Sequence, residues 1–175
     1  MQAGFVLNQS GRLNRTAQYG QYLLMTCPAA GQQSGSVAPP VELAVFQAKE
    51  LMEETIIRWM HRIISNQQQF MMELVQSIHP STGMLQIGIT DKTPFQQLAK
   101  QLQVVREYIS SCDCPDMQFT IHPHLNKADP ALQLLLSNQQ EPAFQGLFEV
   151  KEFLLLKKAH DFDTYKQLNV FALRP

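Results

Sequence analysis

The chain has 175 residues, of which 45% are hydrophobic and 17% charged, and its formal net charge is −1. This composition is typical of one globular domain, which at this length can bury about 70% of its unfolded surface. A net charge near zero gives no electrostatic reason to expect nucleic acid as a partner.

The N-terminal part of the sequence predicts two strands. Residues 5–7 and 19–27 are apolar or aromatic, and the turn formers between them favour a hairpin or a wider strand pair. Pro28 ends the second strand because it has no N–H for a ladder. Residues 28–40 are small and polar, and we interpret them as a flexible linker to a helical part.

Residues 41–78 show helical periodicity, most clearly from Lys49 to Ile78. An unbroken helix over this range would be ~55 Å long at 1.5 Å per residue, which is more than a domain of this size can cover. We therefore expect a break near 65–69 or before Lys49, or a protruding end. Its apolar side chains occupy more than one face, so several neighbours must cover them.

The second half predicts alternating elements. Residues 84–89 indicate a strand, and Thr93 and Pro94 indicate the N-cap and first residue of a helix with an apolar stripe over 95–109. Further strands are expected at 117–121, 147–150 and 169–173, helical segments at 129–136 and 161–168, and a strand or a helix at 153–156.

These elements predict one α+β domain over residues 1–175. In it, a small antiparallel or mixed sheet packs against a long amphipathic helix and two or three shorter helices.

The cysteines and the N-terminus bear on the compartment. Cys27, Cys112 and Cys114 form an odd, sparse set, which is typical of a reducing compartment. Residues 1–12 lack the charged and apolar regions of a secretory signal, and no run reaches the ~18 apolar residues that span a bilayer. We expect a cytoplasmic protein without a membrane span.

Cys112, Cys114, His122 and His124 are the most tempting ligand set, because thiolates and imidazoles bind zinc. The predicted strand between the two pairs would separate them by ~16 Å at ~3.3 Å per residue, so we predict no metal site. No cysteine has a sequence context that activates it as a nucleophile beside a histidine. No glycine-rich phosphate loop occurs either, so we expect no cofactor.

The carboxylates Glu50, Glu53 and Glu54 are interpreted as the solvated face of the long helix. Residues 95–111 have the apolar spacing of a helix-turn-helix, although Gln103 stands where such a turn favours glycine. One unbroken helix explains the same spacing.

The Met- and aromatic-rich helix is the strongest candidate for function. Met fills irregular contacts and Trp anchors interfaces, so an apolar face of this kind is suited to binding another protein. We predict a partner-binding surface made of Met52, Trp59, Met60, Phe70 and Met71.

The sequence therefore favours a non-enzymatic protein-binding module: a small subunit, an adaptor or a secretion-chaperone-like component, in a hetero-complex or a homo-oligomer. Two alternatives remain open. One is a transcription regulator with a helix-turn-helix at 95–111, and the other is a metal-dependent enzyme.

Overall fold

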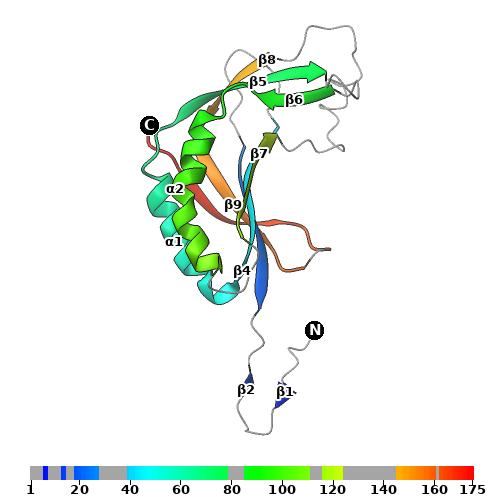
Figure 1. Ribbon diagram of the computed structural model, residues 1–175, viewed down its shortest axis with the longest axis vertical. Helices are drawn as coiled ribbons and strands as arrows, with labels where there is room; N and C mark the ends of the chain where they lie inside the picture. The colour runs from blue at the N-terminus through cyan, green and yellow to red at the C-terminus, as the bar shows by residue number, and fades with distance from the viewer. Residues whose placement is uncertain are drawn as a thin grey trace.

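The computed structural model describes residues 6–7, 13–14, 18–27, 39–78, 85–110, 116–123, 145–160 and 162–175. These residues form a five-stranded and a three-stranded antiparallel sheet, two α-helices and a separate strand pair (Figure 1). The separate pair joins β1 (Val6–Leu7) to β2 (Leu13–Asn14).

The larger sheet has the strand order β10-β9-β3-β4-β7. Its strands are β3 (Tyr19–Thr26), β4 (Val41–Lys49), β7 (Gln118–Pro123), β9 (Glu152–Lys158) and β10 (Lys166–Ala172). The smaller sheet has the order β6-β5-β8, with β5 (Phe70–Ile78), β6 (Leu85–Ile89) and β8 (Gln145–Val150).

The helices α1 (Glu53–Ile64) and α2 (Thr93–Ser110) lie side by side over one face of the larger sheet (Figure 1). A short 3-10 helix, η1 (Glu50–Met52), joins β4 to α1. The core lies between this helix pair and the sheet. Its fully buried side chains include Tyr22, Leu24, Phe46, Phe153 and Leu155 from the sheet and Ile56, Met60, Phe95, Leu102 and Val105 from the helices. We call the covered face the helix face and the opposite one the far face.

The predicted long helix is wrong, and with it the predicted fold class of a small sheet on a long helix with two or three shorter ones. Residues 41–49 form β4 and residues 70–78 form β5, so only 50–64 is helical. Helix α1 ends at Ile64, and the residues after 65–69 continue as a strand and not as a second helical half. Short apolar runs satisfy both helical and strand spacing, and the β-strand pairing of β4 and β5 with distant strands decided between them.

Several shorter predictions are confirmed: the strands at 84–89, 117–121, 147–150 and 169–173, and the helix over 95–109. Residues 153–156 belong to a strand. The helical segment predicted at 161–168 is wrong, because β10 begins at Lys166. The N-terminal strand pairs with residues 13–14 and not with β3. The helix predicted at 129–136 lies outside the described residues, and the single domain with a linker at 28–40 stays a prediction.

The first turn of α2 is capped by Asp91 rather than by Thr93. The Asp91 carboxylate accepts a hydrogen bond from the Thr93 N–H at 2.8 Å, and the Gln96 N–H already bonds the carbonyl oxygen of Lys92. Hydrogen bonds from the side chain and then the backbone of Thr93 lower the pKa of Asp91. The cap is therefore an ionised carboxylate at the positive end of the helix dipole.

We predict that Asp91→Ala lowers the melting temperature, whereas Asp91→Asn, which can also cap, does not at neutral pH. Because the folded pKa of Asp91 is depressed, its contribution is complete above its ordinary value of 3.8 and is lost as the pH falls through the folded pKa. Thermal unfolding of the three proteins between pH 2 and 7 measures this. A wild-type melting temperature that falls in acid no more than that of Asp91→Asn would contradict the assignment.

Candidate functional site

Glu42 is a carboxylate buried within the larger sheet, with only 9% of its surface exposed. A charged group at this depth is costly unless it is hydrogen-bonded. The hydroxyl of Thr120 on the neighbouring strand β7 donates a hydrogen bond to Glu42 Oε1 at 2.6 Å. His122, also on β7, is the cross-strand partner of Glu42. Two adjacent strands thus carry a carboxylate, a hydroxyl hydrogen-bonded to it and an imidazole at the paired position.

A bulge in β4 places Glu42 on the far face. Residues two apart on a regular strand share a face, so Glu42 would point toward the helices with Ala44. The pairing slips instead: Ala44 pairs with Leu24, and Glu42 pairs with the next residue of β3, Met25. Neighbouring residues of β3 point to opposite faces. The slip therefore turns the carboxylate away from the apolar core.

The same slip appears on the other side of β4. Ala44 pairs with Phe119 and Glu42 with His122, so two residues of β7 lie opposite Leu43 alone. One of them, Ile121, has φ = 40°, and it is the only non-glycine residue with positive φ in the part of the chain described. A β-branched residue in this region is strained by about 1–3 kcal/mol.

Strain of this kind persists only where the surroundings enforce it, and it is concentrated at functional sites. Here it falls between Thr120 and His122, the two β7 residues beside Glu42. Carboxylates and imidazoles are the side chains that most often transfer protons in catalysis, and imidazoles do so near neutral pH. Glu42, Thr120 and His122 are therefore the candidate site.

A second charged cluster lies on the helix face. Lys157 Nζ is 2.8 Å from a Glu50 oxygen and 2.6 Å from a Glu53 oxygen, and the Tyr22 hydroxyl donates to Glu53 at 2.8 Å. Gly20 leaves room for it, because an added Cβ would lie 2.9 Å from both Lys157 Cε and the Tyr22 hydroxyl oxygen. The cluster ties η1 and α1 to β3 and β9.

Partial burial alone would lower the pKa of Lys157, but the hydrogen bonds and charges of Glu50 and Glu53 outweigh it and raise the pKa. The three charged groups satisfy one another across the junction of a helix and a sheet. We interpret this cluster as an anchor of the fold and not as a reactive site.

Lys157→Met should lower the melting temperature, because it leaves Glu50 and Glu53 side by side without a cation. Since the folded pKa of Lys157 is raised, its contribution is complete below 10.5 and is lost as the pH rises through the folded value. The difference between the wild type and the variant should therefore shrink above pH 10.5. The control is Lys151→Met, which removes an exposed pair with Glu149. Equal losses in the two variants would contradict the anchor.

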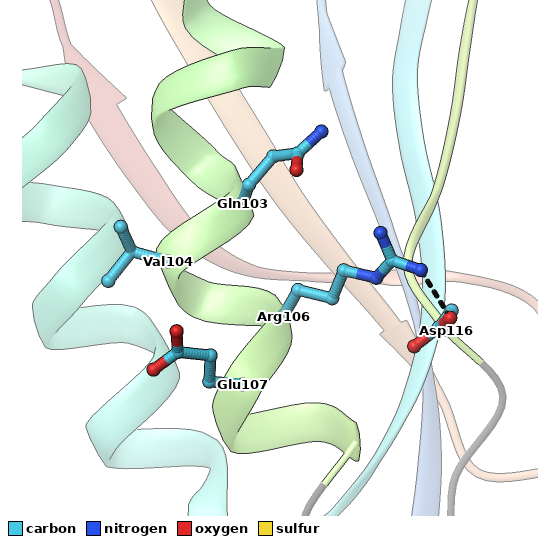
Figure 2. Close-up of a pocket in the computed structure, with 5 residues that line it drawn as sticks. All are labelled: Gln103, Val104, Arg106, Glu107 and Asp116. Atoms are coloured by element: carbon cyan, nitrogen blue, oxygen red, sulfur yellow. Dashed lines mark hydrogen bonds and ion pairs between the residues drawn. The ribbon is translucent and has the colours of Figure 1, made fainter.

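A shallow hollow lies between α2 and Asp116, two residues before the start of β7, and Figure 2 shows its lining side chains. Arg106 and Asp116 form an ion pair across it, and the hydrogen bond from Arg106 to Asp116, then the charge of Asp116, raise the pKa of the guanidinium. Glu107 adds a second negative charge. The cation is thus already matched, and the pair connects the start of β7 to α2.

The structure places the residues of the predicted partner-binding surface in different surroundings, and the surface itself stays a prediction. Met60 is fully buried, and Met52 packs against the core. Trp59 stacks on Tyr108 of α2, with ring centroids 6.0 Å apart, and Phe70 lies edge-to-face with Phe95 at 5.1 Å. Met71 is 51% exposed.

The other sites considered from the sequence are the helix-turn-helix, the metal site and a cysteine nucleophile. The helix-turn-helix at 95–111 is wrong, because Thr93–Ser110 is one unbroken helix whose apolar stripe is buried in the core. Among the described residues no three His, Cys, Asp or Glu side chains could hold a metal ion together. Cys112, Cys114 and His124 lie outside them. Burial, then the nearby Glu152, raise the pKa of the Cys27 thiol, which disfavours a nucleophilic thiolate.

Sequence reasoning missed Glu42. The available signal was a single carboxylate inside the apolar run Val41–Phe46, since charged residues are rarely buried without a structural or chemical reason. Helical periodicity concealed it, because on a helix Glu42 would occupy an unremarkable polar position.

The fold resembles that of solved enzymes. A structure described as a phosphoesterase matches with a TM-score of 0.53 and 16% identity over 91% of this chain and 99% of its own. The structure of E. coli LigT in apo form matches with a TM-score of 0.55 and 16% identity, over 91% of this chain and 100% of its own. Its complex with NADP+ matches with a TM-score of 0.54 and 15% identity over the same shares of the two chains. Other LigT structures contain 3'-AMP, ATP or phosphate. Neither a protein-family model nor a curated protein matches the sequence.

At this identity the likeness establishes the fold. It overturns the expectation of a non-enzymatic adaptor, complex subunit or chaperone-like component, because the fold is one on which a phosphoesterase and nucleotide-bound LigT are built. In the described part of the chain, no helix is long and apolar enough to cross a membrane.

Proposed function

We propose that the protein is an enzyme that cleaves a phosphate ester, with Glu42 and His122 as its acid–base pair. The observation that carries this proposal is the bulge that turns Glu42 onto the far face opposite His122, where Thr120 holds the carboxylate. The phosphoesterase with the same fold supports the reaction type.

Cleavage of a phosphate ester by water needs one group to accept a proton and another to donate one. Glu42 takes the proton of the attacking water as its oxygen forms a bond to phosphorus. His122, as imidazolium, protonates the ester oxygen as its bond to phosphorus breaks. The reaction ends with a protonated Glu42 and a neutral His122, and solvent exchange restores both. Thr120 keeps the Glu42 carboxylate in place through its 2.6 Å hydrogen bond.

A nucleotide is the ligand class that the neighbours favour, because LigT structures contain NADP+, 3'-AMP and ATP. The chemistry proposed above uses side chains alone, and the expectation that no cofactor is required stays a prediction. The cytoplasmic location and the partner protein expected from the sequence stay predictions.

Glu42→Gln should lower kcat on a chromogenic aryl phosphodiester by about 100-fold or more, the usual effect of losing a general acid or base. The same change removes a negative charge that repels phosphate, so the affinity for inorganic phosphate should rise. His122→Asn should lower kcat similarly without raising that affinity. Steady-state kinetics and calorimetric titration with phosphate measure the two effects.

The matched control is Glu107→Gln, which removes a carboxylate from the exposed surface of α2. Its kcat and its phosphate affinity should equal those of the wild type. A wild type that cleaves no phosphate ester, or a Glu42→Gln variant with unchanged kcat, would refute the proposed function.

A further inference from the structure

The register of the larger sheet defines what lies on the far face beside Glu42. Three cross-strand rows run over β4, β3 and β9 in that order, and the members of each row share a face. The first row is Glu42, Met25 and Leu154; the second is Val45, Leu23 and Leu156; the third is Gln47, Gln21 and Lys158. Beyond the third row, Lys49 pairs with Tyr19.

The far face therefore has two polar ends and an apolar centre. Glu42 and His122 occupy one end, and Val45, Leu23 and Leu156 form the centre. The other end carries two cations, Lys49 and Lys158, within a polar and aromatic set completed by Gln21, Gln47 and Tyr19. Met25 and Gln21 are four residues apart on β3, so the two ends are separated by ~13 Å at ~3.3 Å per residue.

The cationic end is built into the sheet. Lys158 lies over the ring of Tyr165, with its Nζ 5.2 Å from the ring centroid, which orients the ammonium group. Lys158 and Lys49 are both half-buried, and Tyr19 is 43% exposed. Lys157, the residue before Lys158, points to the helix face and is already matched by Glu50 and Glu53. Lys158 is therefore the β9 lysine that faces the same side as Glu42.

We infer that Lys49 and Lys158 bind a second phosphate group of the nucleotide whose ester lies at Glu42 and His122. This inference rests on the proposed function and extends it, because it defines the substrate as a nucleotide with two separated phosphate groups. Ammonium groups bind phosphate through charge-assisted hydrogen bonds. The apolar centre accommodates a sugar or a base between the two ends, and the exposed Tyr19 ring offers a stacking surface.

The distribution of charge favours this arrangement. Glu42 repels a phosphate at the reactive end, so that end alone contributes little to ground-state affinity. Binding energy from a remote, non-reacting part of the substrate can offset such a cost. The two lysines provide it, Lys158 in a row ~13 Å away and Lys49 in a row ~20 Å away at ~3.3 Å per residue, and the protein fixes these distances because all the residues concerned belong to paired strands.

The test compares two nucleotides by calorimetric titration. NADP+ has a pyrophosphate and a separate 2'-phosphate, whereas 3'-AMP has one phosphate. The variant Lys49→Ala/Lys158→Ala should bind NADP+ about tenfold more weakly or worse than the wild type, which corresponds to the loss of at least one charge-assisted hydrogen bond. Its affinity for 3'-AMP should fall by a smaller factor, because the single phosphate of that ligand can also occupy the Glu42 end.

Two further variants of the protein serve as controls. Lys100→Ala removes an exposed lysine of α2, on the side of the sheet opposite to the far face, and should leave both affinities unchanged. Lys49→Arg/Lys158→Arg retains the charges and should keep most of the NADP+ affinity, which guards against misfolding as the cause of the loss.

The outcomes separate this inference from the proposed function. A double alanine variant that binds NADP+ as the wild type does, or loses affinity for both nucleotides equally, overturns the second phosphate site. The chromogenic phosphodiester is too short to span both ends of the far face, so its cleavage reports on the Glu42 end alone. A wild type inactive on that ester refutes the proposed function, whereas selective loss of NADP+ affinity in the variant still supports the site.

Discussion

Strand β4 pairs with β3 on one side and with β7 on the other, and both ladders slip at Leu43. Without the slip, Glu42 would point into the apolar layer between the sheet and the helices, where an ionised carboxylate costs several kcal/mol. With it, the carboxylate lies on the far face beside Thr120 and opposite His122. The position of the whole candidate site follows from one extra residue in β4 relative to β3 and one extra residue in β7 relative to β4.

The packing around the bulge offsets what the bulge costs. Leu43 itself is fully buried, and burial of a leucine side chain stabilises a fold by about 1.5–3 kcal/mol. That is comparable to the strain of about 1–3 kcal/mol at Ile121. The Lys157 cluster and the Asp91 cap fix α1 and α2 over the opposite face, so the sheet cannot relax toward regular pairing without disturbing its core. A rigid scaffold of this kind suits a site that needs its proton-transfer groups held in place.

The sequence predicted the elements whose pattern is local. The helix over 95–109 has a clean stripe at spacings of three and four, and 117–121 alternates strictly, so both were correct. The prediction from sequence failed where the pairing of strands that are distant in the chain determines the secondary structure. Residues 41–49 and 70–78 are apolar enough on both sides to satisfy either period, and their partners lie far away in the chain. The site depends on the same long-range information, because a bulge is a property of two paired strands. A lone carboxylate within Val41–Phe46 was the only local trace of it.

The proposed mechanism requires a substrate phosphate to lie at the bulge, between β4 and β7. A crystal structure of the protein with 3'-AMP tests this most directly. We expect the phosphate on the far face, within hydrogen-bond distance of the His122 imidazole and next to the Glu42 carboxylate held by Thr120. A phosphate bound elsewhere, for example by Arg58 and Arg62 in the hollow between α1 and β10, with the Glu42 end empty, would contradict it.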